Sequence, residues 1–361
     1  MTKLSILFAY RNREVSRIKR CLESLKTQYN KDFEVIFVDY GSDDAFSKPI
    51  KETVGTFEFT NYYYVAHPGL LWNKSRALNF AVKQAKGTSV FIADVDIIFK
   101  TGAVDFLLSK NTNNSFYLFR LGYLNQTESN KVINSTSFEQ LRVKHFGVIN
   151  GLVLLSKEAF INVNGLDDFF HFYGSEDVDF FNRLEQFGLK KVNCTEDFFY
   201  HIWHRIYNSF DDSRFEVTPR HFNIKKINLQ HLIHNKELKI IKPNTNINFG
   251  EVFIKEDEKV LDHPEIIISI NNEHAKVWHF LNVGINHYSG KVVKFTITED
   301  SYFNSTKFFL KRILKKKDQV PISMKNASDM VLGKIISRYQ NHNYRFEISN
   351  DLKTILWTIQ L

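Results

Sequence analysis

The sequence Phe91-Ile92-Ala93-Asp94-Val95-Asp96-Ile97-Ile98-Phe99 is an apolar run that carries two carboxylates. Buried strands read as near-continuous apolar runs, and side chains at i and i+2 lie on one face. We therefore expect Asp94 and Asp96 to point the same way at the end of a buried strand. Two like charges there need a partner, and a divalent cation that also holds a nucleotide diphosphate supplies one. Two acids that face solvent at a strand end are the alternative.

Apolar strands and amphipathic helices alternate on the N-terminal side of this run. We expect strands at 4–10, 34–39 and 62–66 and helices at 14–27 and 71–86, the second helix closed by Gly87. This alternation predicts an α/β fold with a mainly parallel sheet and helices on both faces. Such sheets bind ligands at the carboxyl ends of their strands. The residues expected to converge on that crevice are Arg11, Arg13, Asp39, Asp94 and Asp96.

The composition of the 361 residues, 43% hydrophobic and 24% charged, is that of a globular protein with one large domain or two ordinary ones. The net charge of +8 suits a polyanionic partner, but no recognised nucleic-acid motif accompanies it, so we expect no nucleic-acid partner. Cys21 and Cys194 make no disulfide framework and suit a reducing compartment. No apolar run reaches membrane-span length. We expect a cytoplasmic protein, or one that is peripheral on the inner face of the plasma membrane.

A second acidic segment, Tyr173-Gly174-Ser175-Glu176-Asp177-Val178-Asp179, precedes a helix expected at 180–187. Three acids at the start of a helix interact favourably with its N-terminal dipole, which is the structural interpretation. A carboxylate on a helix N-terminus beside an aromatic wall can also serve as a general base, which is the functional one.

The third polar cluster is His201-Ile202-Trp203-His204. An odd spacing places the two imidazoles on opposite faces of a flat strand, so they can share a site only on a helix or turn. Two neutral imidazoles and a carboxylate suit Mn²⁺ better than an all-oxygen Mg²⁺ site does. Packing among the neighbouring aromatic side chains is the alternative.

Five ordered motifs in residues 3–210 resemble those of inverting glycosyltransferases of the GT-A fold. The chain is most similar to the β-1,4-galactosyltransferase family, within the broader family-2-like nucleotide-sugar transferases. Its segments and the family motifs that they resemble are 10–14 (F-R-N-R-E), 72–79 (F-N-R-A-K-L-L-N), 94–96 (D-V-D), 146–165 (F-G-G-V…L-S-K…N-G) and 173–184 (W-G-G-E-D-D-D-I-F-N-R-L). His201-Ile202-Trp203-His204 stands where the family has M-x-x-H.

The resemblance implies a role for each matching residue. Tyr10, Arg11, Arg13, Asp39 and Arg76 would bind the donor's uridine and diphosphate, and Asp94 the ribose or the water shell of the metal. Asp96, His201 and His204 would bind Mn²⁺ or Mg²⁺. Asp177 would be the catalytic base, with Glu176 contacting acceptor or donor sugar and Tyr173 and Gly174 forming the sugar platform.

The implied activity is metal-dependent transfer, with inversion, from a UDP-sugar to a hydroxyl of a glycan or lipid-linked acceptor. Galactose or N-acetylgalactosamine is favoured as the sugar. The Golgi anchor and stem of the animal enzymes are absent, which points to bacterial surface polysaccharide synthesis. Tyr173, Ser175 and His201 replace the family's Trp, Gly and Met, so the acceptor platform is changed. The alternative is a non-catalytic glycan- or nucleotide-binding protein on a degenerate GT-A fold.

The resemblance ends near residue 215. We expect a catalytic domain at 1–215, a helical and linker segment at 216–249, and a smaller β-rich accessory region at 250–361 with strands near 252–254, 266–270, 292–297, 344–348 and 354–359. The accessory region could bind a glycan acceptor, pair subunits in an oligomer or complete the core. Its segment 305–318 is basic and amphipathic, which suits either an anionic membrane that carries a lipid-linked acceptor or packing on the domain.

Overall fold

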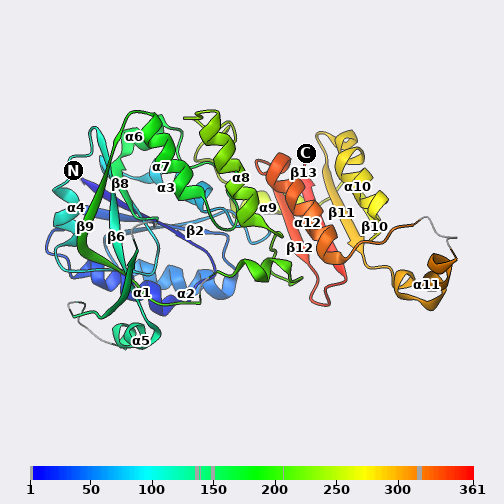
Figure 1. Cartoon of the computed structure of the whole chain (residues 1–361), viewed down its shortest axis with the longest axis horizontal. Coiled ribbons are helices and arrows are strands. Elements are labelled where there is room, and N and C mark those ends of the chain that lie inside the picture. Colours follow the sequence, from blue (N-terminus) through cyan, green and yellow to red (C-terminus); the bar gives the residue numbers. More distant parts are fainter. Residues whose placement is uncertain (1–2, 135–137, 139, 148–150, 206, 315–318) are drawn as a thin grey trace. The chain divides into compact units, whose positions relative to one another are not determined.

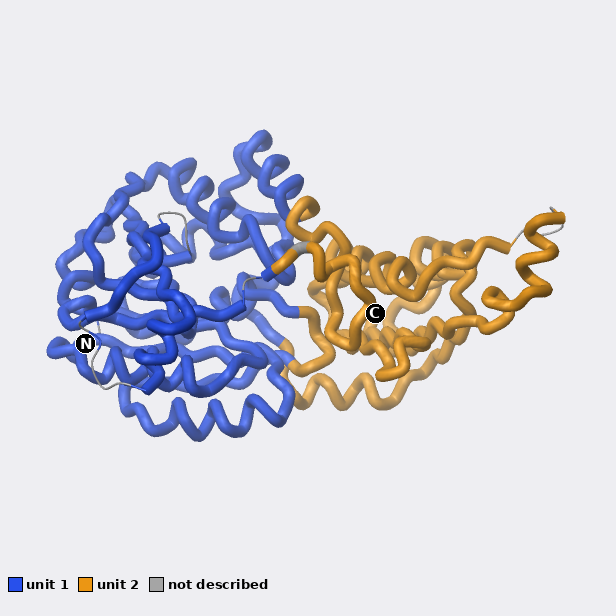
Figure 2. The backbone as a smooth tube through the Cα atoms, turned by 60° about the horizontal axis from the view of Figure 1, so that its bottom comes forward, with its two compact units in different colours: residues 1–66, 72–207, 228–252 blue, residues 67–71, 208–227, 253–361 orange. Residues whose placement is uncertain are grey.

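The computed structural model describes residues 3–134, 138, 140–147, 151–205, 207–314 and 319–361. The chain divides into two compact units (Figure 2). Unit 1 contains residues 1–66, 72–207 and 228–252, and unit 2 contains residues 67–71, 208–227 and 253–361. Of the helical and linker segment expected at 216–249, residues 228–249 therefore belong to unit 1.

Unit 1 is built on a large mixed sheet with the order β3-β2-β1-β4-β8-β6-β9-β5, to which β7 is added on β6. Its first half is parallel, as expected, and consists of β1 (Leu4–Tyr10), β2 (Phe33–Tyr40), β3 (Thr60–Val65) and β4 (Ser89–Ala93). The second half is mixed: β4 pairs antiparallel with β8, β8 with β6 and β5 with β9, whereas β6 and β9 are parallel. Its strands are β5 (Ile97–Phe99), β6 (Ser115–Leu124), β7 (Val143–Gly147), β8 (Val153–Ser156) and β9 (Lys190–His201).

Helices cover both faces of this sheet, as expected. Figure 1 shows α1 and α2 on one side and α3, α6 and α7 on the other. The side chains between the sheet and helices α1 and α2 form an apolar core, in which Phe91, Phe119 and Phe199 meet within 5.2–5.4 Å between ring centroids. The helices of unit 1 are α1 (Val15–Lys26), α2 (Asp44–Gly55), α3 (Lys74–Gln84), α4 (Ala103–Leu108), α5 (Gln126–Asn134), α6 (Lys157–Asn162) and α7 (Glu176–Gln186), together with the part of α8 (Ile224–Glu237) that follows residue 227.

The expectation that Asp94 and Asp96 share the face of one strand is wrong. Strand β4 ends at Ala93, and Asp94-Val95-Asp96 forms a turn before β5. The reason lies in the pairing, because β4 runs beside β1 whereas β5 pairs with β9. The apolar run therefore changes neighbours at its two carboxylates.

Two further expectations need correction. The helix expected at 71–86 begins at Lys74 and ends at Gln84, so Gly87 does not close it; a Cβ on Gly87 would lie 2.7 Å from the Ser5 backbone nitrogen, and close approach to β1 explains this glycine. Residues 252–254 form no strand. The apolar run at 148–156 predicts a further strand, of which β8 (Val153–Ser156) is observed and residues 148–150 lie outside the described residues.

Unit 2 contains a smaller sheet with the order β10-β11-β13-β12. Strands β10 (Ile266–Asn271) and β11 (Val292–Thr298) are parallel and are connected through α10 (His274–Asn282), whereas β12 (Tyr344–Ile348) and β13 (Thr354–Gln360) form an antiparallel hairpin. The fully buried Trp357 on β13 packs against Tyr339. The unit is thus α/β rather than only β-rich. Its other helices are α9 (Lys255–Glu258), α11 (Thr306–Ile313) and α12 (Met324–Lys334).

Among the described residues, no helix has both the length and the apolar character needed to cross a bilayer.

Candidate active site

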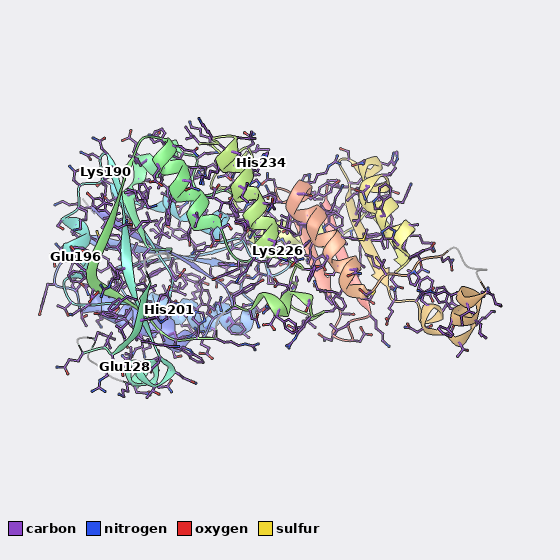
Figure 3. All side chains as sticks on the ribbon, in the orientation of Figure 1. Glu128, Lys190, Glu196, His201, Lys226 and His234 are labelled. Atoms are coloured by element: carbon purple, nitrogen blue, oxygen red, sulfur yellow. The ribbon has the colours of Figure 1, made fainter. Side chains whose placement is uncertain are left out.

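Asp96, His201 and His204 come together at one point of unit 1. Their ligating atoms all lie within 4.8 Å of one another, with Asp96 Oδ1 3.6 Å from His201 Nε2 and Asp96 Oδ2 3.4 Å from His204 Nε2. The β5–β9 ladder produces this meeting, because Ile97 pairs with His201 and the Ile202 amide donates to the Asp96 carbonyl. His201 is the last residue of β9 (Figure 3), and residues 202–205 are not part of a strand, so the two imidazoles need not point to opposite faces.

The donor set of this cluster fits a divalent cation. His204 Nδ1 lies 2.8 Å from the Arg205 carbonyl oxygen, so its proton belongs on Nδ1 and the Nε2 lone pair faces Asp96. A lone pair that faces a carboxylate is repulsive unless positive charge lies between them. Asp96 also has a positive partner that the sequence did not indicate, the largely buried Arg17, whose Nη1 lies 3.5 Å from Asp96 Oδ2.

A second charged cluster centres on Lys74, the first residue of α3. Its Nζ lies 3.2 Å from Asp94 Oδ1 and 3.8 Å from Asp177 Oδ1. The pKa of Asp94 is lowered, chiefly by the charge of Lys74, with smaller contributions from His201 and His204. Asp94 is therefore the link between the metal-ligand cluster and the Lys74 cluster.

Asp177 lies in the first turn of α7 and is the group most suited to accept a proton. Burial raises its pKa to about 7; Lys74 opposes this rise, and the charges of Glu176 and Asp94 add to it. Burial also disfavours the Lys74 ammonium, but Asp177, Asp94 and Glu176 outweigh this effect, so the pKa of Lys74 is raised. A cation beside a carboxylate whose pKa is near neutrality is what a general base needs.

The backbone before α7 is strained. Phe172, Gly174 and Ser175 have φ values of 62°, 101° and 74°, a left-handed region that costs a residue with a Cβ on the order of 1 kcal/mol. This turn leaves Tyr173 exposed, where its ring stacks on Tyr207 at 4.6 Å between centroids. Burial and then Glu176 raise the pKa of Tyr173, with smaller effects from Lys74, Asp94 and Asp177, so the ring borders the same charged cluster.

Helix α7 is fixed in place by a buried ion pair one turn after Asp177. Arg183 Nε lies 2.7 Å from Asp179 Oδ2, and the Arg183 guanidinium also donates to the carbonyl oxygens of Val163 and Gly165. Asn235, on the part of α8 that belongs to unit 1, donates to Asp179 Oδ1. Of the three acids that open the helix, Asp179 therefore has a structural partner.

The segment after β1 is held against the segment after β2. Asn12, with φ 48°, donates from Nδ2 to Asp43 and accepts from the Asp43 amide on Oδ1. An asparagine tolerates this left-handed conformation, which explains the residue between Arg11 and Arg13. The sequence alone gave Asn12 no role.

Asp39 and Tyr10 lie opposite each other at the carboxyl ends of β2 and β1. Asp39 is fully buried and accepts hydrogen bonds from the Ser42 amide and the Tyr62 hydroxyl. Burial raises the pKa of Asp39, and these hydrogen bonds and the charge of Arg11 oppose that rise. The hydroxyl of Tyr10 donates to the Arg13 carbonyl, and burial raises the pKa of Tyr10 to about 12. Of the group predicted at the strand ends, Asp39 and Arg11 therefore lie near each other, beside Tyr10.

Arg76 pairs with a carboxylate outside these two clusters. Its side chain is 7% exposed, and its Nε lies 3.3 Å from Asp168 Oδ2. Asn79 also donates to Asp168, so Arg76 belongs to an interior network between α3 and the 167–168 loop.

Gly151 lies beside the Lys74 cluster and leads to a first prediction. A Cβ on this glycine would lie 3.0 Å from Asp177 Oδ2 and 3.1 Å from Lys74 Nζ. Gly151→Ala should displace both side chains by a few tenths of an ångström and lower kcat/KM roughly tenfold with little loss of stability, because the displaced groups are side-chain ends. Gly55→Ala is the matched control, since its Cβ would contact nothing within 4 Å. Unchanged activity in Gly151→Ala would argue against a reactive role for this cluster.

A mixed sheet with helices on both faces, and with a D-x-D pair, three side chains that could ligate a metal and an acidic helix N-terminus, is the arrangement expected of the GT-A fold that the motifs resemble. Residues 5–150 match the model of Glycosyl transferase family 2, and residues 132–205 match the model of the N-terminal domain of galactosyltransferase. The resemblance found in the motifs is thereby confirmed for residues 5–205, which are similar to family-2-like glycosyltransferases.

Comparisons with individual proteins add little to these family matches. No curated protein sequence matches the chain. A structure of GalNAc-T7 with UDP, GalNAc and Mn²⁺ aligns with a TM-score of 0.43 and 14% identity over 56% of this chain and 43% of that one. The mannosyltransferase PcManGT from Pyrobaculum calidifontis, in complex with GDP-Man and Mn²⁺, aligns with a TM-score of 0.41 and 15% identity over 58% of this chain and 60% of that one. The chain thus spans less than two thirds of either structure, and likeness at these TM-scores supports no conclusion about it.

Proposed function

We propose that this protein transfers a sugar from a UDP-sugar to an acceptor hydroxyl with inversion, and that Asp177 is the base. The observation that carries the proposal is the Asp94–Lys74–Asp177 cluster, in which burial raises the pKa of Asp177 to about 7 beside a lysine. A carboxylate of this kind accepts a proton near neutral pH better than an ordinary aspartate does.

In this mechanism Asp177 accepts the proton of the acceptor hydroxyl as its oxygen attacks C1 of the donor sugar. The new C1–O bond forms on the face opposite UDP, the bond between C1 and the diphosphate oxygen breaks, and its electron pair leaves with UDP. One carboxylate suffices, because inversion is a single displacement. Glu176 and the exposed ring of Tyr173, with Gly174, are proposed to contact the sugars.

Asp96, His201 and His204 are proposed to hold a divalent cation, with Mn²⁺ favoured by the two imidazoles. When bound, the cation would neutralise the charge that develops on the leaving diphosphate. Arg11 and Arg13, after β1, are proposed to bind the diphosphate by paired hydrogen bonds, and Asp39 the uridine. Asp94, between the two clusters, is proposed to orient the ribose or the water shell of the cation.

The donor sugar is proposed to be galactose or N-acetylgalactosamine, which rests on the match of residues 132–205 to the galactosyltransferase model. The acceptor is proposed to be a glycan or a lipid-linked glycan of bacterial surface polysaccharide synthesis. Tyr173 and Ser175, where the family has Trp and Gly, should make acceptor choice differ from that of the family.

The stereochemistry of the product tests the proposed reaction. Proton NMR of the first-formed glycoside should show β-configuration when the donor is an α-linked UDP-sugar. An α-linked product would require a second carboxylate nucleophile and would contradict the single displacement at which Asp177 acts.

Lys74 provides a second prediction. Its charge opposes the rise in the Asp177 pKa, so Lys74→Met should raise that pKa further. An opposite charge at this distance changes a pKa by about 1–3 units, so kcat/KM should fall about tenfold or more at pH 6 and recover as the pH is raised. Lys74→Arg keeps the charge and is the control. A loss in Lys74→Met that is equal at every pH would show that Lys74 acts by contact with substrate alone.

A further inference from the structure

Helix α11 of unit 2, with Leu314 after it, carries an exposed apolar face that no part of the proposed reaction uses. Phe309, Leu310, Ile313 and Leu314 are 63%, 58%, 60% and 61% exposed. Positions i, i+1, i+4 and i+5 of a helix lie on one side of it, so the four side chains form a continuous face, here called the α11 face. Large apolar surfaces exposed together mark interaction sites.

The opposite side of α11 holds the helix to the turn before it. Phe308 is buried and packs at 5.5 Å from Tyr302 and 5.2 Å from Phe303, between ring centroids. The Ser305 hydroxyl accepts from the Phe308 amide and caps the helix, and Lys311 Nζ lies 5.9 Å from the Tyr302 ring. Because Phe308 faces the turn at 301–304, the α11 face points away from that turn. Figure 1 shows α11 apart from the sheet of unit 2.

The charges around the α11 face are all positive. Between Ser301 and Lys317 the sequence contains no acid and six cations, namely Lys307, Lys311, Arg312, Lys315, Lys316 and Lys317. The exposed side chains of Lys307 and Arg312 flank the apolar face at its two edges. Residues 315–317 lie outside the described residues and contribute here through their sequence alone.

We propose that the α11 face docks on an anionic lipid bilayer. Its four apolar side chains enter the boundary between headgroups and acyl chains, and the flanking cations contact lipid phosphates. The charges favour a bilayer over a second copy of this chain as the partner of the α11 face. A second copy would place the same cations against each other, whereas an anionic surface complements them. An enzyme held there would meet a membrane-bound acceptor in two dimensions, a consequence that rests on the proposed function, whereas the docking itself does not.

Vesicle sedimentation of the full chain tests this docking. Vesicles of phosphatidylcholine with roughly one third phosphatidylglycerol should bind the protein, and pure phosphatidylcholine vesicles should bind it far less. The double variant Phe309→Ser/Ile313→Ser should lower the partition coefficient at least tenfold. Lys307→Gln/Arg312→Gln should lower the partition coefficient about fivefold for each charge removed, on anionic vesicles only. Raising the salt concentration should weaken the binding of the wild type to anionic vesicles.

The matched control is Tyr29→Ser/Ile247→Ser, which removes two apolar side chains that are even more exposed, at 82% and 78%. It should bind vesicles as the wild type does. Wild-type protein that stays in the supernatant with anionic vesicles, or a control that loses binding equally, would overturn the proposal. A wild-type dimer that Phe309→Ser/Ile313→Ser converts to monomer, without vesicle binding, would assign the α11 face to a second copy instead. UDP binding, measured separately, reports on the active site and leaves this test independent of it.

Discussion

Replacing Asp177 by asparagine should lower sugar transfer roughly 10²–10⁴-fold, the contribution of a positioned general base, and leave UDP binding within about twofold. The amide keeps the size of the side chain but cannot accept the proton of the acceptor hydroxyl. The variant should also fold normally, because asparagine removes a buried charge that its neighbours Glu176 and Asp94 disfavour.

The pH dependence gives the same prediction in a second form. Transfer requires ionised Asp177, so with a pKa of about 7 the wild-type kcat/KM should fall about tenfold for each pH unit below neutrality. The residual activity of Asp177→Asn should lack this dependence.

The matched control is Glu185→Gln, another carboxylate of α7, which is half-exposed and ion-paired with Lys191 at 3.7 Å. It should retain wild-type activity and the wild-type pH profile. Asp177→Asn protein that loses UDP binding and transfer together would instead assign Asp177 a structural role.

Removing the metal site is the other change with a large expected effect. Excess EDTA should abolish transfer and Mn²⁺ should restore it, because the charge on the leaving diphosphate would otherwise be uncompensated. Asp96→Asn should lower Mn²⁺ affinity and reduce transfer by roughly 10³-fold, which corresponds to several kcal/mol of lost stabilisation.

Asp197→Asn is the control for this carboxylate, since Asp197 is a surface residue paired with Arg120 at 3.0 Å. Isothermal titration with Mn²⁺ separates a metal effect from a general loss of fold. Undiminished transfer in excess EDTA would show that Asp96, His201 and His204 hold no catalytic cation.

The sequence predicted the general form of this site because its polar residues follow apolar strands. The positions of Asp39 and Tyr10 at the ends of neighbouring parallel strands required only the strand pattern. The face of Asp94 and Asp96 could not be predicted in the same way. It depends on the pairing of β5 with β9, and β9 lies about a hundred residues further along the chain.

Residues whose partners come from distant segments were the ones that the sequence did not place. Lys74 stands in a recognised motif, but its contacts with Asp94 and Asp177 exist only because α3, the β4–β5 turn and α7 meet. Arg76, two residues later, is buried and pairs with Asp168, a contact that the sequence did not indicate, and its role at the donor stays a prediction. A sequence motif identifies a basic residue, whereas the packing of distant segments determines which groups its side chain contacts.

The most direct test of the account is UDP release from a panel of UDP-sugars, with Mn²⁺ and without it. The donors are those with galactose, N-acetylgalactosamine, glucose, N-acetylglucosamine and glucuronic acid. The account predicts slow, Mn²⁺-dependent hydrolysis of one donor, galactose or N-acetylgalactosamine, by the wild type and a large loss in Asp96→Asn. Tight UDP binding without turnover of any donor, even with acceptor glycans added, would favour a non-catalytic binding protein. Failure to bind UDP at all would contradict the assignment of the crevice.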